Sequence, residues 1–384
     1  MAAIIGVGAL SAAGIGAKIG WENLRKGRTF LTPHTLFDTG LTTTPVTGSV
    51  DSFSNDTFFS RTEALAVAAI DEALTGLDLS GKRVGLVVGT TVGGLDHSEQ
   101  FYKELKANPT LISQAPKEFA RHEPGALSGF LAKKYNCSGF HTLSTACSSG
   151  LHAIGLGHRF IENNTYDVVI ALGVDALSFL TIRGFDSLLL VDYEGTKPFD
   201  KNRIGISLGE GAGAVILTND SIFTPLAQVE GWGASADAYH MTAPHPEGDG
   251  ATKAINDALS ETELNADAID FIIAHGTGTP DNDASETNTF KRCFSTVPPF
   301  TSLKGAIGHT LAASGALEVV YGIQSLNEQI LLPTVNHTTP DPQLLSPITT
   351  ATKIKATRFL KTAFGFGGNN GALIVSTIDA KEEL

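Results

Sequence analysis

Short apolar runs alternate with longer segments of helical periodicity along the 384-residue chain. In the first part of the chain the apolar runs cover 2–7, 84–88, 142–144, 168–172 and 213–217, and the helical segments include 61–74 and 124–134. In the second part the apolar runs cover 226–230, 271–274, 300–303, 362–366 and 372–376, and the helical segments include 253–261, 283–293 and 312–327. Short apolar runs predict strands, and the longer periodic segments predict helices. The alternation predicts an α/β protein with largely parallel sheets covered by helices, because parallel neighbours need crossover connections.

The two parts follow one plan, which indicates an internal duplication. In each part the third strand ends in a loop of small residues that carries one reactive side chain and leads into a helix rich in Gly, Ala and Ser. This side chain is Cys147 in the first part and His309 in the second. We therefore expect these two residues to face each other near a pseudo-twofold axis. We place the N-terminal half at 1–222 and the C-terminal half at 223–384.

The composition narrows the class of protein. An apolar fraction of 42% with 41 glycines fits a well-buried, loop-rich α/β protein. The net charge of -13 argues against general binding to nucleic acids or anionic membranes. The apolar segment 1–20 lacks a basic start and is broken by glycines, so it predicts a buried strand rather than a signal peptide. No apolar run approaches the roughly 18 residues of a membrane-spanning helix.

Cysteine usage bears on the compartment and on metal binding. The chain has three cysteines, Cys137, Cys147 and Cys293, with no disulfide spacing and no second Cys or His at metal-ligand spacing. An odd count of this kind indicates a reducing compartment, for which cytoplasm is the default. We therefore predict a cytoplasmic protein without a metal site.

Cys147 is the strongest candidate for a nucleophile. It lies between a short β run and a helix, and its neighbours Ala146, Ser148 and Gly150 leave room for a substrate. The unpaired N–H groups and the positive dipole end at a helix start favour a thiolate over a thiol. We therefore expect an activated thiolate at this junction.

Two histidines strengthen this interpretation. His275 ends an apolar strand and precedes the hydroxyls of Thr277 and Thr279, whereas His309 lies at a helix start. Lys304 precedes His309, and Glu318 follows it on the same helix. A lone histidine is usually structural, but two on Gly-rich strand ends in a chain with one well-presented cysteine predict a Cys/His/His site.

Several motifs together carry a family resemblance. They are the Thr-Ala-Cys-Ser-Ser-Gly segment at 145–150, Pro-Phe-Asp at 198–200 with Arg203, the Gly-rich segment 209–213, the loops at 236–242 and 275–279, the segment 304–309 and Phe-Gly-Phe-Gly-Gly at 364–368. In this order, and over nearly the whole chain, they resemble the β-ketoacyl-acyl-carrier-protein synthases of the elongating type. The resemblance implies a thiolase-like fold, in which two duplicated α/β halves form a five-layered αβαβα sandwich, normally as a homodimer.

The resemblance also implies an acyltransferase mechanism. Cys147 would attack the thioester of an acyl carrier protein, with the backbone N–H groups of Cys147 and Phe366 holding the oxyanion. His275 and His309 would hydrogen-bond the thioester carbonyl of the malonyl carrier while carbon dioxide leaves. The resulting enolate would attack acyl-Cys147 and release a 3-oxoacyl thioester that is two carbons longer.

The remaining roles follow from the same resemblance. Thr277 and Thr279 would bind the pantetheine arm, Lys304 and Glu318 would support the histidines, and Phe366 would act as a gate. Further substrate contacts are expected at Phe364, Gly365, Gly367 and Gly368, with Asp237 in a supporting position. No metal or redox cofactor is implied, because the partner carrier protein brings the phosphopantetheine.

Departures from the family pattern concern specificity. Asn369 replaces the usual Thr after the two glycines, and Ala312-Ala313 replaces the usual Gly-Ala, so loop mobility and cavity shape are expected to differ. Ser98 falls where the fatty acid elongating synthases usually carry a bulky aliphatic residue. We interpret this as a deeper acyl pocket, suited to a long, unsaturated or aryl-polyene chain.

Related enzyme classes fit the sequence less well. A thiolase would have a second cysteine near the C-terminus, but 364–370 has none and Cys293 lies in a polar helical segment. An initiating synthase would carry Asn in place of one histidine, and a non-catalytic chain-length partner would lack the nucleophile. The pathway stays open between fatty acid elongation and a polyketide or pigment chain, as does the choice between a homodimer and a heterodimer with a related subunit.

The carrier protein is usually acidic, so it would need a local basic patch on this acidic chain. The candidates for such a patch at the pocket mouth are Lys133, Lys134 and Arg203.

Overall fold

The computed structural model describes residues 1–50, 53, 58–262 and 264–378. In the first half of the chain, five strands lie side by side in a single sheet. Their order across the sheet is β6 (Gly139–Leu143), β5 (Val84–Gly89), β7 (Val168–Asp175), β8 (Gly211–Thr218) and β1 (Ala2–Ser11), and β2 (Gly14–Ile15) pairs with β1. The five main strands overlap all five of the runs that the sequence pattern predicts for this half, and four of these runs lie wholly within a strand.

The second half repeats this arrangement. Its strands follow in the order β9 (Ala227–Ala236), β15 (Asn369–Ser376), β14 (Arg358–Gly365), β10 (Phe271–Ile273) and β11 (Phe300–Thr301). Pairing of β1 with β9 joins the two halves into one continuous sheet. The proposed boundary at 222/223 falls in the connection from β8 to β9, and the division into two domains stays a prediction.

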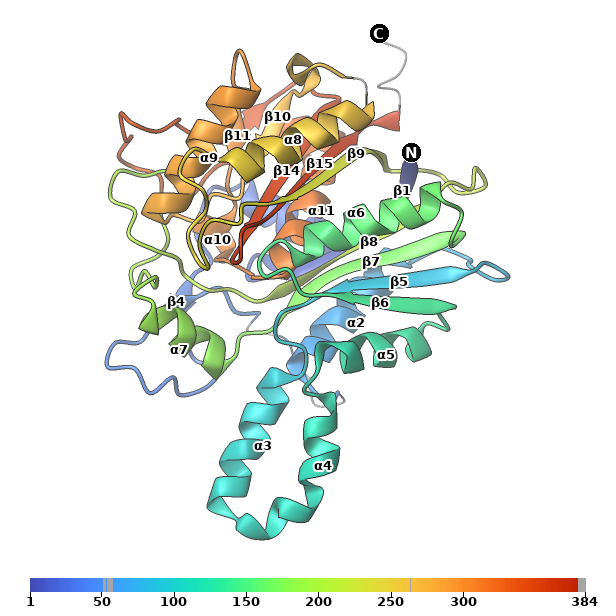
Figure 1. Ribbon diagram of the computed structural model, residues 1–384, viewed down its shortest axis with the longest axis vertical. Coiled ribbons are helices and arrows are strands. Elements are labelled where there is room, and N and C mark those ends of the chain that lie inside the picture. Colours follow the sequence, from blue (N-terminus) through green and yellow to red (C-terminus); the bar gives the residue numbers. More distant parts are fainter. Residues whose placement is uncertain (51–52, 54–57, 263, 379–384) are drawn as a thin grey trace.

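Helices complete a five-layered arrangement (Figure 1). The centre is formed by α6 (Ser149–Glu162) and α11 (Ala313–Glu328), which pack against each other and against both halves of the sheet. The outer layers are α2 (Arg61–Ala73) with α5 (Pro124–Lys134) on one side, and α8 (Asp249–Thr262) with α9 (Pro280–Cys293) on the other. Three large apolar clusters fill the spaces between these layers. The expected αβαβα sandwich is confirmed.

The prediction of largely parallel sheets is wrong in detail. The pairs β5–β6, β5–β7, β10–β11 and β10–β14 are parallel, but β1–β8, β7–β8, β9–β15 and β14–β15 are antiparallel. Alternation of strands and helices does not reveal direct hairpins such as the one that joins β14 to β15. That hairpin needs only the three residues 366–368, a connection that suits antiparallel neighbours.

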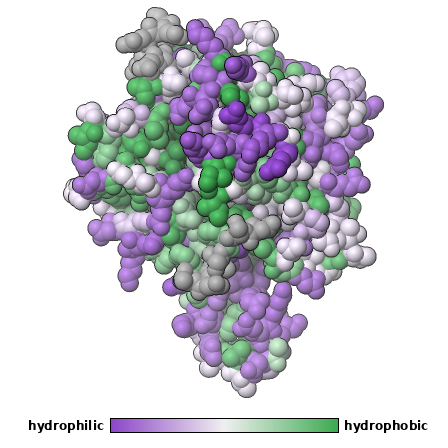
Figure 2. Space-filling model, turned by 180° about the vertical axis from the view of Figure 1, so that it is seen from behind, coloured by the Kyte–Doolittle hydropathy of each residue, from purple (hydrophilic) through white to green (hydrophobic). Residues whose placement is uncertain are grey.

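An arm extends from the body between β5 and β6. It contains α3 (Leu95–Ala107), the short helix α4 (Ala115–Glu118) and two 3-10 turns, and it projects from the body in Figure 1. Figure 2 shows that its surface is mainly hydrophilic with a few hydrophobic residues. Tyr102 and Ile112 are the exposed large hydrophobic residues of the arm, at 55% and 64% exposure.

The remaining elements are short or peripheral. They are α1 (Ala17–Leu24), α7 (Phe179–Ser187), α10 (Lys304–Ile307) and the two-stranded pairs β3 (Thr32–Pro33) with β4 (Val46–Thr47) and β12 (Ile330–Leu331) with β13 (Thr352–Lys353). Among the described residues, no helix is long and apolar enough to cross a membrane.

Candidate active site

Cys147 lies in a tight turn between β6 and α6. Ala146 adopts a left-handed conformation, with φ of 51°, which turns the chain sharply before the cysteine. The Ser149 hydroxyl fastens this turn, because it accepts the Thr145 N–H at 2.8 Å and donates to the Ala146 carbonyl at 2.6 Å. The Cys147 side chain is only 5% exposed. The strand-to-helix junction expected from the sequence is therefore present.

The second half repeats this turn before α11. Leu311 has φ of 52°, and Ser314 follows it by three residues, as Ser149 follows Ala146. By this correspondence the partner of Cys147 is Ala312, three residues after His309. Cys147 and His309 therefore do not occupy equivalent positions in the two turns, because the histidine precedes the repeated turn while the cysteine lies within it.

The two turns contact each other directly. The Gly150 N–H donates to the Ala312 carbonyl at 3.0 Å. A Cβ added at Gly150 would lie 2.4 Å from that carbonyl oxygen, and one added at Gly315 would lie 2.6 Å from the Leu151 nitrogen. Glycines thus allow α6 and α11 to start against one another, which brings the cysteine and histidine loops to the same place.

A cavity of about 120 Å³ joins these loops. The predicted site residues in its lining are Cys147, Asp237, His275, Thr277, Thr279, His309, Phe364, Gly365 and Phe366. Other lining residues were not anticipated, among them Phe185, Leu190 and Ile206, which come from the connection between β7 and β8. The structure therefore brings the Cys/His/His set into one cavity.

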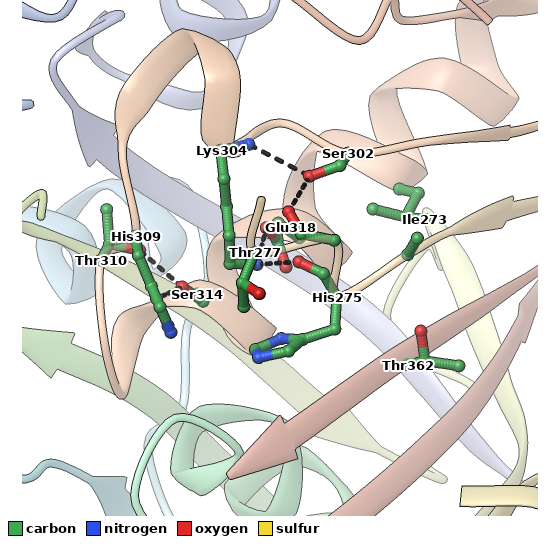
Figure 3. A network of polar contacts seen from close by, with 12 residues as sticks. Ile273, His275, Thr277, Ser302, Lys304, His309, Thr310, Ser314, Glu318 and Thr362 are labelled. Carbon is green, nitrogen blue, oxygen red and sulfur yellow. Dashed lines mark hydrogen bonds and ion pairs between the residues drawn. The ribbon is translucent and has the colours of Figure 1, made fainter. Parts of the chain in front are cut away.

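His275 follows β10 and has its backbone fixed on both sides. Its N–H and that of Gly276 donate to the two carboxylate oxygens of Glu286, at 2.8 and 2.7 Å. Its carbonyl accepts from Lys304 Nζ at 2.5 Å. The imidazole lies edge-on to that of His309, with 5.4 Å between the ring centroids, and Figure 3 shows the two rings at the same side of the polar network.

The hydrogen bonds of His309 determine its tautomer. Its Nδ1 accepts the Leu311 N–H at 3.2 Å and lies 3.1 Å from the Ser314 hydroxyl. A ring nitrogen that accepts an N–H bond carries no proton, so the neutral ring has its proton on Nε2. That N–H is available as a hydrogen-bond donor in the cavity.

Burial is the main cause that lowers the pKa of both histidines well below the usual range. The positive charge of Lys304 adds to this effect in each case, and His309 contributes further at His275. Both rings are thus neutral near pH 7. Neutral imidazoles can donate hydrogen bonds to a carbonyl oxygen without carrying a charge of their own.

The protonation state of Cys147 differs from the expectation. Burial is the main cause that raises the pKa of its thiol to about 12, and the nearby Asp175 carboxylate acts in the same direction. Lys304 and the backbone N–H groups of Phe366 and Cys147 act in the opposite direction but do not outweigh burial. The predicted resting thiolate is therefore wrong, because the pattern could not show how completely the helix start is enclosed. The thiol must lose its proton during acyl transfer.

Behind the histidines lies a buried ionic network that includes a residue missed in the sequence. Lys304 Nζ lies 3.0 Å from one Glu318 oxygen, and Lys361 Nζ lies 2.5 Å from the other. Lys304 thus holds the His275 carbonyl and Glu318 pairs with Lys304, both from outside the cavity lining (Figure 3), and their support of the histidines stays a prediction. Lys361 was not predicted, although a lysine within the apolar segment 358–366 was a visible signal.

Two buried acids were also missed as site residues. Glu286 holds the His275 loop, as described above. Asp175, at the end of β7, accepts the Thr91 N–H at 2.8 Å and the Ala312 N–H at 2.9 Å. Both carboxylates accept hydrogen bonds from backbone N–H groups of the loops that carry the site. The signal for Asp175 was an acid directly after an apolar run, whereas Glu286 lies in a polar helical segment that gives no such signal.

The hairpin between β14 and β15 carries Phe366. Gly367 and Gly368 follow with φ of 82° and 77°, which glycine adopts without strain. The Gly368 carbonyl accepts the Asp237 N–H at 2.9 Å. One carboxylate oxygen of Asp237 in turn accepts from Asn370 Nδ2 at 2.8 Å. These two glycines lie outside the cavity lining and shape the turn that presents the Phe366 N–H.

The structure places Ser98 away from the lining of this cavity. It lies on α3, is 4% exposed, and its hydroxyl donates to the Gly94 carbonyl at 3.2 Å. Its expected role as a direct substrate contact therefore has no support from the cavity that holds Cys147.

The three candidate docking cations differ in their surroundings. Arg203 pairs with Asp341 at 2.8 Å, and its side chain is only 10% exposed. Lys133 and Lys134 line a separate groove with Arg121 and Phe130. None of these three candidates lines the cavity that holds Cys147, and the basic docking patch stays a prediction. In the described part of the chain, no group of three or more His, Cys, Asp or Glu side chains is arranged to hold a metal ion.

Sequence comparisons show which family this chain is similar to. The model for "Beta-ketoacyl synthase, N-terminal domain" matches residues 2–221, and that for "Beta-ketoacyl synthase, C-terminal domain" matches 226–338. The chain is 30% identical to 3-oxoacyl-[acyl-carrier-protein] synthase 2 of Coxiella burnetii, with 98% of each chain covered. It is also 30% identical to the protein of the same name from Synechocystis, with 96% of each covered.

The solved structures to which this chain is similar are also ketosynthases. The ishigamide ketosynthase/chain length factor superposes with a TM-score of 0.93 at 28% identity, covering 98% of each chain. A structure of the ketosynthase ApeO in complex with its chain length factor ApeC, from Xenorhabdus doucetiae, superposes with a TM-score of 0.85 at 32% identity, again covering 98% of each chain. With both family models matched in sequence order, the chain belongs to the β-ketoacyl synthases, a family of condensing enzymes with the thiolase-like fold.

Proposed function

We propose that this chain condenses an acyl group, carried on Cys147, with malonyl-acyl carrier protein to give a 3-oxoacyl carrier and carbon dioxide. The observation that carries the proposal is one enclosed cavity that contains Cys147 and two neutral histidines, His275 and His309. A nucleophile and two uncharged donors suit a reaction in which negative charge develops twice on a thioester oxygen.

In the first half-reaction, the Cys147 sulfur attacks the acyl thioester. The backbone N–H groups of Cys147 and Phe366 already interact with the thiol, so a carbonyl oxygen bound beside it would lie within their reach. Collapse of the tetrahedral intermediate breaks the bond to the carrier sulfur. The proton lost by Cys147 ends on that sulfur, which leaves as a free thiol.

In the second half-reaction, His275 and His309 donate hydrogen bonds to the malonyl thioester oxygen. Loss of carbon dioxide leaves the electron pair of the broken bond as an enolate, whose negative oxygen these donors stabilise. The enolate carbon then attacks the acyl group on Cys147. The cysteine leaves as a thiolate and takes up a proton, which returns the enzyme to its resting state.

The carrier protein is the proposed partner for both half-reactions. Thr277 and Thr279 lie in the cavity lining with their hydroxyls 2.9 Å apart, where they can hydrogen-bond the amides of a pantetheine arm. Phe366, which contacts Phe185 at 5.5 Å between ring centroids, would act as the gate. Free Cys137, Cys147 and Cys293 support a cytoplasmic location.

A second candidate is the catalytic subunit of a heterodimer with a chain length factor. It is favoured by the likeness to two structures whose titles name a ketosynthase with its chain length factor. Strand β6 lies at the sheet edge with Phe140 48% exposed, which supports a dimer of either kind. A homodimer would fit fatty acid elongation, whereas a heterodimer would fit a polyketide or aryl-polyene pathway.

The test is the intact mass of the protein after mixing with a panel of acyl-carrier thioesters, followed by malonyl carrier. An acyl adduct that Cys147→Ala abolishes, and that turns over to a 3-oxoacyl product, is the expected result. The donor that reacts fastest names the preferred chain. If no donor forms an adduct with the chain alone but one does after a chain length factor is added, the heterodimer is supported. No adduct under either condition would overturn the condensing role.

A further inference from the structure

Lys361 is a fully buried cation that the mechanism above does not use. It lies on β14 directly opposite Ile273 of β10, and its side chain has no exposed surface. Its Nζ lies 2.5 Å from Glu318 and donates to the carbonyls of Ile273 at 3.3 Å and Ala274 at 3.2 Å. Both of its hydrogen bonds to carbonyls therefore lie at the end of the strand that leads to His275, while its ion pair comes from α11.

Together with Lys304, this lysine engages three successive carbonyls. Lys361 takes those of Ile273 and Ala274, and Lys304 takes that of His275. Glu318 joins the two cations through its two carboxylate oxygens. The strand end that carries His275 is thus held by two ammonium groups that share one acid.

The charges of this cluster do not cancel. Two cations face one anion, Glu318, and the next carboxylate, Glu286, is occupied by two backbone N–H groups and the Thr362 hydroxyl. Burying an ammonium costs several kcal/mol, and an apolar side chain is often the more stable choice at such a position. A second buried lysine therefore calls for a role other than stability.

We propose that Lys361 is a positioning residue for condensation, which fixes the His275 strand end and supplies part of the positive potential behind the two catalytic histidines. The proposal rests on the function proposed above. The groups that face Lys361 are Glu318 and Lys304, with Glu286 beyond them and the two imidazoles on the cavity side.

The electrostatic effects agree with this geometry. Lys361 lowers the pKa of both His275 and His309, which keeps them neutral, after the larger effects of burial and Lys304. Burial lowers the pKa of Lys361 itself to about 8, although Glu318 acts to raise it. Below that pH the lysine is charged and can stabilise the enolate, and above it the charge is lost. Decarboxylation should therefore weaken as the pH rises through about 8.

The test is the pH profile of carbon dioxide release from malonyl carrier between pH 6 and 10. Wild type should show a basic limb near pH 8. Lys361→Met removes the charge while keeping an unbranched side chain, so it should lower the rate about tenfold at pH 7 and abolish that limb. The matched control is Lys253→Met, an exposed lysine of α8 paired with Asp257, which should keep the wild-type profile.

A double variant separates charge from structure. Lys361→Met with Glu318→Gln restores the original net charge of the cluster, because one cation and one anion are removed together. It should recover part of the rate lost in Lys361→Met if the potential matters. A purely structural role predicts that the double variant is at least as impaired as the single one, and that result would overturn the electrostatic part of the proposal.

The outcomes distinguish this inference from the function on which it rests. If wild type neither forms the Cys147 adduct nor releases carbon dioxide, the proposed function fails. If wild type does both but shows no basic limb, the role of Lys361 fails, even where Lys361→Met cannot be folded. A limb that persists unchanged in Lys361→Met would overturn it equally.

Discussion

Ala146 and Leu311 have almost the same positive φ, 51° and 52°, and lie three and two residues before the central helices α6 and α11 begin. Each turn belongs to one half of the duplicated fold. Only the first turn carries a nucleophile, because Cys147 follows Ala146 whereas Ala312 follows Leu311. In the second half the reactive residue, His309, comes before the turn. The cavity thus receives Cys147 from within the first turn and His309 from the segment before the second.

The contact between the two turns is expected to be intolerant of added volume. Gly150→Ala would place a Cβ 2.4 Å from the Ala312 carbonyl oxygen, which forces α6 and α11 apart. We expect a loss of about 2 kcal/mol or more in the free energy of unfolding, measured with urea. Acylation of Cys147 should fall with it.

The matched control is Gly125→Ala on α5, where an added Cβ meets nothing within 4 Å. This change should leave stability the same or raise it by up to about 1 kcal/mol, because alanine is the better helix former. Equal destabilisation by both changes would show that the close approach of the two turns is unimportant.

Sequence patterns predicted the parts of this molecule that depend on local chemistry. Buried strands such as β7 and the small-residue turn at Cys147 have clear signatures, and the resemblance brought Cys147, His275 and His309 together. These three do share one cavity. Local signals suffice where a residue's role depends on its immediate neighbours.

Features that depend on long-range packing could not be predicted. The antiparallel pairing of β14 with β15 follows from a hairpin whose turn residues also match a catalytic motif. The thiol pKa of Cys147 depends on burial by several distant segments, which outweighs the local helix start. In the sequence Lys361 resembles an ordinary strand lysine, because its contacts with β10 and α11 come from distant segments of the chain.

The raised pKa of Cys147 predicts a particular pH dependence of alkylation. Because the thiol pKa is about 12, the thiolate fraction should rise about tenfold for each pH unit between 7 and 9. We expect the iodoacetamide rate at Cys147, followed by peptide mass spectrometry, to rise in the same proportion. A rate that levels off below pH 8 would instead reveal a preformed thiolate.

The turn after β14 should control acylation through the Phe366 N–H. Gly368→Ala introduces a side chain at φ of 77° and places its Cβ 2.8 Å from Asp237 Cβ. The turn must shift, so the N–H no longer points at the oxyanion. We expect the rate of acyl adduct formation to fall about 100-fold, as when one oxyanion donor is lost.

Gly81→Ala is the control for backbone strain alone. Gly81 has φ of 75° but no neighbour within 4 Å of an added Cβ. It should lose about 1 kcal/mol of stability and retain wild-type acylation. If both glycine variants acylated normally, the Phe366 N–H would have no part in the reaction.

The prediction for Ser98 tests whether the acyl pocket reaches beyond the cavity seen around Cys147. Ser98 is buried on α3, outside that cavity, so only an acyl chain that passes between the arm and the body would reach it. Ser98→Ile adds a branched side chain at this depth and should shorten the longest chain transferred to Cys147. Ser98→Ala, which removes only the bond to the Gly94 carbonyl, should keep the wild-type profile. An unchanged chain-length distribution in Ser98→Ile, read from the masses of the acyl adducts, would confine the pocket to the residues that line the Cys147 cavity.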